Sequence, residues 1–208
     1  MTEAQVLNTL QIQLPEKAVD YAFGLWKEKP FNLKLTKSRQ TKIGDFTCRD
    51  GAVHPRITLN HDLNPFTFLI TYIHEVAHLH VFLEFGHRVE PHGEHWKTAF
   101  QRLLTPVLTL EIFPNKILAP LTMHMQNPKA SSFADRVLTK ALRAFDEQAH
   151  SDIVLSDIPE GSLFQLNGRF FKKGKLRRTR ILCKEVHSKR QYLVPAEALV
   201  SNVQLSIL

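Results

Sequence analysis

Cysteine is scarce in this chain. Only Cys48 and Cys183 occur among the 208 residues, and they stand too far apart in the sequence to form a short zinc knuckle. This scarcity excludes a small secreted scaffold held together by disulfides and a four-cysteine zinc ribbon. Two unpaired thiols fit a reducing compartment, so we expect a cytoplasmic protein.

Long apolar runs and a secretory leader are also missing. The first residues, MTEAQVLNTLQ, lack the basic start and apolar run of a signal peptide. No stretch of about 18 consecutive apolar residues occurs, so the sequence predicts no membrane span and no membrane partner. Hydrophobic residues make up 43% of the chain, which is enough for a real core and argues against wholesale disorder.

Acidic residues are missing from one end of the chain. Residues 161–208 hold ten Lys and Arg against two acids, Glu185 and Glu197, so the formal charge of this segment is +8. The formal charge of the whole chain is +7. The preceding 160 residues are close to neutral at −1. A charge so concentrated favours an acidic partner, and we expect nucleic acid before membrane.

The length suits one mid-sized domain and a small second one. We expect a domain over residues 1–150, a linker over 151–160 and a separate basic module over 161–208. Within the module, short alternating runs predict β-strands that are joined at Asn167-Gly168 and at Lys173-Gly174.

Helical and strand patterns alternate in the first domain. Residues 3–28 predict a helix in two pieces, with Pro15 opening the second, because a missing N–H costs nothing at a first helical position. Period-two alternation then predicts a small antiparallel sheet of about three strands. The stretches with this pattern are FNLKLT, KIGDFTC and PRITLN.

A long apolar helix should follow the sheet. Asn64 is a plausible N-cap, Pro65 fits the first helical position, and the apolar run ends at Phe85, before a glycine. A further helix is expected over about 94–104. Residues 105–130 carry several prolines and predict an irregular strap.

The stretch YIHEVAHLH, residues 72–80, lies inside the long helix. Residues four apart on a helix lie about 40° apart and one turn along, so His74 and His78 can point two imidazoles at one ion. Glu75 is rotated by about 100° from His74, which suits a base that reaches an activated water instead of the metal. Zinc lowers the pKa of such a water to about 7.

A catalytic zinc needs a third protein ligand and one open position. His87 follows His78 by nine residues, but the glycine that marks the metzincin spacing is absent. The segment PHGEHWK offers the other donors, and spacing alone does not rank them. The competing residues are His92, His95, Glu94 and Glu90.

HEVAH followed by EPHGEHWKTAF resembles the SprT-like and Spartan metalloproteases. That family pairs an HExxH helix with a histidine-glycine segment that ends in an aromatic residue, here Trp96, and PRITLN is similar to its last strand. The resemblance covers roughly residues 15–105. It implies one zinc ion (Zn2+) and protein substrates on DNA, such as crosslinked proteins. The residues it implies are the zinc ligands His74, His78 and His92 and the catalytic Glu75.

The resemblance implies an α+β fold. A zincin-like minimal metalloprotease core, made of helices and a small antiparallel sheet, would be followed by the small basic all-β module. One departure concerns the family's cysteine ribbon, because this chain has only Cys183 in that region. Nucleic-acid binding by the module therefore rests on its charge.

Aromatic side chains stand among the charges of the module, where they could stack on bases or form its core. Arg177, Arg178 and Arg180 lie on one predicted strand, so Arg178 should face away from the other two. The predicted contacts to DNA or RNA are Lys172, Lys173, Lys175, Arg177, Arg178 and Arg180.

Two functions fit the sequence. The first is a zinc-dependent metallopeptidase that acts on DNA-associated or DNA-crosslinked proteins. The alternative is a non-catalytic nucleic-acid-binding or regulatory protein in which zinc only joins two helices. Glu75 separates the two, because a purely structural zinc site has no use for a base beside its ligands.

Overall fold

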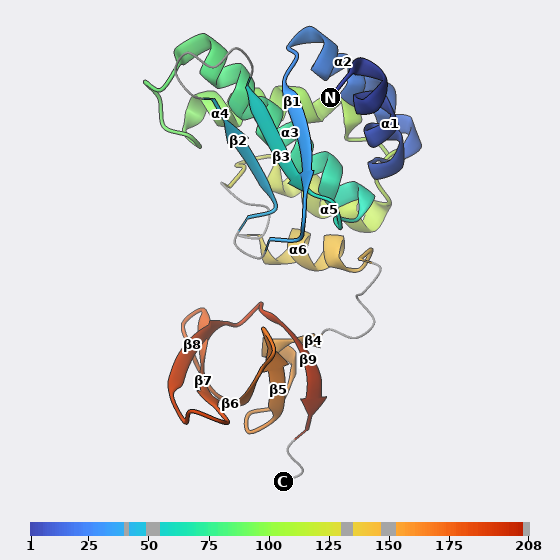
Figure 1. Cartoon of the computed structure of the whole chain (residues 1–208). Helices are drawn as coiled ribbons and strands as arrows, with labels where there is room; N and C mark the ends of the chain where they lie inside the picture. The colour runs from blue at the N-terminus through green and yellow to red at the C-terminus, as the bar shows by residue number, and fades with distance from the viewer. Residues whose placement is uncertain (40–41, 49–54, 130–134, 147–152, 206–208) are drawn as a thin grey trace. The chain divides into compact units, whose positions relative to one another are not determined.

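The computed structural model of this chain describes residues 1–39, 42–48, 55–129, 135–146 and 153–205. The chain forms two compact units, Met1–Asp146 and Glu147–Leu208. Helices and a small sheet make up the first unit, and a larger antiparallel sheet makes up the second (Figure 1). The α+β class expected from the sequence is confirmed.

The chain begins with a helix in two pieces, as predicted. Helix α1 spans Glu3–Gln13, the short turn η1 spans Glu16–Ala18, and α2 spans Val19–Glu28. Pro15 stands at the junction as the N-cap residue of η1. The chain therefore turns where an N–H is missing, and the apolar faces of both pieces enter the core.

The sheet of the first unit is mixed, so the prediction of an antiparallel sheet is wrong in part. Strand β3 (Arg56–Asn60) lies between β1 (Asn32–Thr36) and β2 (Gly44–Thr47). Strands β1 and β3 run parallel, whereas β2 and β3 run antiparallel. Strand β3 takes the central position in the sheet because it is the most buried strand, with Ile57 and Leu59 fully enclosed. Strand β2 is left at an edge of the sheet.

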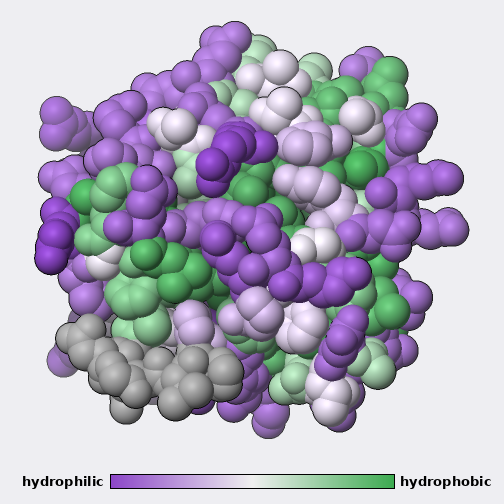
Figure 2. All heavy atoms as spheres, turned by 90° about the horizontal axis from the view of Figure 1, so that it is seen from above, coloured by the Kyte–Doolittle hydropathy of each residue, from purple (hydrophilic) through white to green (hydrophobic). Residues whose placement is uncertain are grey.

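Helix α3 (Pro65–Phe85) is the centre of the first unit. The Asn64 side chain accepts hydrogen bonds from the backbone N–H groups of Phe66 and Thr67, so the predicted cap is present. By length and composition α3 could cross a membrane, but 72% of the apolar window is buried inside the protein. The apolar side chains of α3 are thus mostly in contact with the core. The face of the molecule drawn in Figure 2 is mainly hydrophilic, with apolar residues in smaller groups.

Three further helices follow in the first unit. Helix α4 (Glu94–Leu104) lies where it was predicted, and α6 spans Arg136–Arg143. The prediction of an irregular strap over 105–130 is wrong, because α5 (Asn115–His124) forms inside it. Three residues of α5 at helical spacing are buried, and this burial holds the helix together around Pro120. The buried residues are Ile117, Leu121 and His124.

Six antiparallel strands form the second unit, in the order β4-β9-β5-β6-β7-β8. Figure 1 shows the sheet curling around its own core. That core is separate from the core of the first unit and includes Phe164, Phe171 and Cys183. The strands are β4 (Ile153–Val154), β5 (Leu163–Leu166), β6 (Arg169–Arg177), β7 (Arg180–Glu185), β8 (Gln191–Pro195) and β9 (Leu199–Gln204).

The predicted linker 151–160 is wrong where the structure describes it. Strand β4 pairs with β9, and the turn η4 (Leu155–Asp157) places Leu155 in the core. The segment after β4 is held because Leu155 and Ile158 are buried in the core of the second unit. Residues 151 and 152 lie outside the described residues.

The predicted joint at Lys173-Gly174 is also wrong. Strand β6 continues through both residues to Arg177, and the hairpin turn falls at Arg178-Thr179. Arg178 adopts a φ of 57°, so it belongs to the turn and does not alternate along a strand with its neighbours. The joint at Asn167-Gly168 is confirmed, with φ angles of 51° and 74°.

Lys173 is a structural residue of the second unit. Its side chain points inward, is 9% exposed, and donates from Nζ to the backbone oxygens of Ser156 and Ile158. The prediction that Lys173 contacts nucleic acid is therefore wrong, because its ammonium group is already used to hold the segment after β4. Buried carbonyl groups need such donors.

Lys173→Ala should destabilise the second unit by about 1–3 kcal/mol, because two backbone carbonyls lose their donor. Lys172→Ala is the matched control, since Lys172 is exposed on the same strand. Chemical unfolding of the full chain, monitored by circular dichroism, measures both. Equal unfolding curves for the two variants would contradict the structural role of Lys173.

Candidate metal centre

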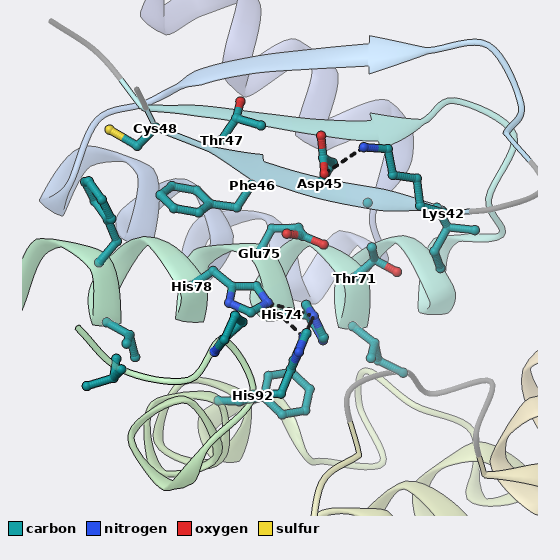
Figure 3. A pocket seen from close by; sticks show the side chains of 18 of the residues that line it. Lys42, Asp45, Phe46, Thr47, Cys48, Thr71, His74, Glu75, His78 and His92 are labelled. Carbon is teal, nitrogen blue, oxygen red and sulfur yellow. Dashed lines mark hydrogen bonds and ion pairs between the residues drawn. The ribbon is translucent and has the colours of Figure 1, made fainter. Parts of the chain in front are cut away.

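Three imidazoles converge on one point beside α3. His74 and His78 project from successive turns of that helix, and His92 comes from the segment just before α4. The Nε2 atom of His78 lies 3.1 Å from Nε2 of His74 and 3.1 Å from Nε2 of His92, and the third separation is 3.2 Å. Figure 3 shows the three rings pointing inward at one another.

The separations fit a metal ion. A tetrahedral ion bound at about 2.1 Å holds two nitrogen ligands about 3.4 Å apart, close to the separations seen here. Neutral imidazole nitrogens aimed at a common point repel one another unless a proton or a cation lies between them. Across the part of the chain that the structure describes, this is the one group of three His, Cys, Asp or Glu residues arranged to hold a metal.

A buried aromatic residue supports the three rings. Trp96 of α4 is fully enclosed, and its ring centroid lies 4.6, 5.6 and 4.8 Å from those of His74, His78 and His92. Phe100 stacks on Trp96 at 5.0 Å and also packs on His74 at 5.7 Å. Trp96 is thus a packing residue that fixes the orientation of the imidazoles.

The competing third ligands lie elsewhere. His95 is exposed and its ring packs on Phe85 at 4.2 Å, while His87 packs on Phe82 at 5.0 Å. Glu90 and Glu94 are also exposed, and neither belongs to the histidine group. Of the candidates that spacing had left open, His92 is the one whose ring groups with His74 and His78.

Burial keeps the three histidines uncharged. Burial, together with smaller contributions from His78, His92 and His124, lowers the pKa of His74 to about 2. Burial first and His92 second lower the pKa of His78 to about 4, and burial lowers the pKa of His92. A metal ligand must be a neutral imidazole, so the site favours the protonation state that binding requires.

Glu75 lies on α3 between His74 and strand β2, with 6% of its surface exposed (Figure 3). Burial first, and the charge of Asp45 second, raise the pKa of its carboxyl to about 8. A hydrogen bond from the backbone N–H of Phe46 opposes this rise. The carboxyl therefore binds a proton more readily than an exposed glutamate does, and its position is fixed by the hydrogen bond from the edge strand β2.

Strand β2 approaches Glu75 closely at Gly44. A Cβ atom on Gly44 would stand 2.5 Å from Oε1 of Glu75 and 2.6 Å from Cγ2 of Thr71. Both distances are shorter than any ordinary contact, so the position admits no side chain without a shift. Gly44 thereby lets the backbone of β2 reach the carboxylate.

The histidines and Glu75 line a cleft of about 840 Å³. Residues 42–48 of β2 and its flanks form one wall, and α3 and the segment around His92 form others. A volume of this order is typical of ligand and substrate sites. The cleft is thus large enough for a segment of a polypeptide beside the three imidazoles.

His124 also lines the cleft, although the sequence gave it no role. Its Nδ1 atom lies 3.4 Å from Oδ2 of Asp135, the residue that caps α6. The pair joins α5 to α6 beside the cleft that the three imidazoles line. Sequence reasoning missed it because the helix α5 that carries His124 had been predicted as irregular strap.

The predicted nucleic-acid contacts lie in the second unit. Five of the six are exposed, and Lys173 is the exception described above. Lys172, Lys175 and Arg177 are on β6, Arg178 is in the turn, and Arg180 begins β7. These residues therefore lie on one hairpin of the second unit.

The comparisons with known proteins agree with this geometry. Residues 13–113 match the model of the SprT-like family, a span that includes the sheet, helix α3 and all three histidines. No curated protein and no solved structure matched the chain. Over residues 13–113 the chain is similar to the SprT-like family, whose domains are generally metal-dependent and of metalloprotease type.

Proposed function

We propose that this protein is a zinc-dependent metallopeptidase that cleaves proteins associated with nucleic acid. The observation that carries the proposal is the convergence of three imidazole nitrogens within 3.2 Å of one another, next to the carboxyl of Glu75 in an open cleft. The SprT-like match supports the peptidase class.

The metal in this proposal is zinc, held by His74, His78 and His92. Three histidines are a ligand set used by catalytic zinc, which keeps its remaining position free. When bound, zinc supplies a Lewis acid that polarises a peptide carbonyl and makes water acidic near neutral pH. Trp96 packs on all three rings, and Phe100 packs on Trp96 and His74, which keeps the imidazoles in place.

Glu75 acts as the proton carrier. Its carboxylate accepts a proton from the attacking water and passes it to the leaving amine of the cleaved peptide. Burial raises the pKa of this carboxyl, so Glu75 is a stronger base than an exposed glutamate. The N–H of Phe46 and the absence of a side chain at Gly44 keep the carboxylate in position.

The charge of the second unit is the reason that the proposal includes nucleic acid. Residues 161–208 carry a net +8, which suits a polyanion on which protein substrates are bound. Such a module raises the local concentration of substrates near the peptidase by attaching both to one molecule.

His92→Ala should weaken zinc binding by about 100-fold or more, because loss of a partner outside the ligand shell alone costs roughly 10–100-fold. His95→Ala is the matched control and should keep wild-type zinc content, since its ring packs on Phe85. Metal analysis after dialysis against a weak chelator measures both. Loss of zinc from the His95 variant, with zinc retained in the His92 variant, would overturn the ligand assignment.

Glu75→Gln should keep zinc and the fold but lose peptide hydrolysis, because an amide cannot accept the proton. The loss in kcat is expected to be at least about 100-fold, the contribution of a positioned acid–base group. Digestion of casein, with and without DNA, provides the assay. Turnover in this variant at the wild-type rate would refute the role of Glu75, and no turnover in the wild type under any condition would favour the non-catalytic alternative.

Gly44→Ala should lower kcat about tenfold to 100-fold while zinc content stays normal, because the new Cβ pushes the Glu75 carboxylate out of place. Gly24→Ala is the matched control, since a Cβ there meets nothing within 4 Å. Steady-state kinetics of both purified variants, with their zinc contents, provide the measurement. Equal kcat values in the two variants would show that β2 does not position Glu75.

A further inference from the structure

Two pairs of like charges face each other across strands β6 and β7. Lys172 is the direct partner of Lys184, and Arg177 is the direct partner of Arg180. Side chains directly opposite in an antiparallel pair lie close together on one side of the sheet, and like charges there are destabilising. The sheet therefore carries a repulsion that an anion between the pairs would relieve.

A β-bulge brings the two pairs to the same side of the sheet. Lys172 and Arg177 are five residues apart on β6, so simple alternation would place them on opposite faces. The register shifts between Lys173 and Leu176, which adds one residue to β6 and restores the facing. Gly174 allows this bulge, because a Cβ there would stand 2.5 Å from the backbone oxygen of Leu182.

The four cations of this face, which we call the cationic ladder, are Lys172, Lys184, Arg177 and Arg180. All four are exposed, and no carboxylate within the described residues forms an ion pair with them. Arg180 and Lys184 are four residues apart on β7, which is on the order of 13 Å. One small anion cannot reach both pairs, so the ladder suits an extended polyanion.

Apolar side chains lie on the same face as the ladder. Phe170 precedes Lys172 by two residues on β6 and is 45% exposed, and Leu193 is 51% exposed. Leu193 pairs with Leu182 on β7, between the two cation pairs. A polyanion that also carries flat, apolar groups would cover these side chains and neutralise the ladder together.

We propose that the outer face of β6, β7 and β8 binds single-stranded nucleic acid, with phosphates at the cationic ladder and a base stacked on Phe170. A duplex offers phosphates but encloses its bases, so it would leave Phe170 and Leu193 uncovered. An acidic peptide offers charge without the stacking groups. This inference locates the nucleic-acid contact of the proposed function, but binding needs no proteolysis, so either proposal can fail alone.

Binding of the full chain to a labelled 20-nucleotide DNA strand of mixed sequence, followed by fluorescence anisotropy over a range of salt, tests the proposal. Lys172→Gln/Lys184→Gln and Arg177→Gln/Arg180→Gln should each reduce the log–log salt slope by about 1.4, which is roughly 0.7 per phosphate contact on a single strand. Phe170→Ala should weaken binding about tenfold with little change in slope.

The matched control is Lys189→Gln/Arg190→Gln, which removes the same charge from exposed positions between β7 and β8, off the ladder. It should change the slope by less than half as much. An RNA strand of the same sequence separates the two sources of single-stranded partner, and stronger binding of either one supports the proposal. The Gln variants should also keep or raise the unfolding temperature, because each removes a like-charge pair.

Three results would overturn the proposal. The first is no binding of either strand at low salt. The second is binding of the matched duplex, or of a 20-residue polyglutamate, at least as tight as that of the single strand. The third is an equal loss of slope in the control and in the ladder variants, which would show diffuse attraction to the whole module.

Discussion

Three uncharged imidazole nitrogens cannot meet at one point in a protein interior unless something positive joins them. This constraint organises the first unit. Helix α3 supplies His74 and His78, and its long apolar run anchors it in the core so that the two rings stay fixed. The segment before α4 must then return His92 to the same point, and the buried Trp96 holds it there.

Helix α3 also carries Glu75, whose position depends on the edge strand β2. Glu75 is one residue from His74, so its carboxyl emerges between the metal ligands and β2. Only a strand without a side chain at position 44 can come close enough for the Phe46 N–H to reach it. In the second unit a glycine also has a specific role. The bulge at Gly174 brings to one face cations that strand periodicity alone would place on opposite faces.

Local signals predicted much of this structure. The Asn64 cap, the Asn167-Gly168 turn and the pairing of His74 with His78 each depend on a few adjacent residues, and each was recovered from the sequence. What escaped depends on distant partners: the parallel pairing of β1 with β3, the burial of Lys173, and helix α5 with His124. The charge of Lys173 predicted a solvent-exposed side chain. Its side chain instead points inward, because it donates to the backbone carbonyls of Ser156 and Ile158, which lie 17 and 15 residues away in the sequence.

The central claim is that His74, His78 and His92 hold one zinc ion with a position left open for chemistry. X-ray absorption at the zinc edge on the purified full chain tests this most directly. The account predicts one zinc per chain with about three imidazole nitrogens and one oxygen, at about 2.0–2.1 Å. Zinc absent from the protein, or bound to sulfur at about 2.3 Å through Cys48 or Cys183, would contradict it.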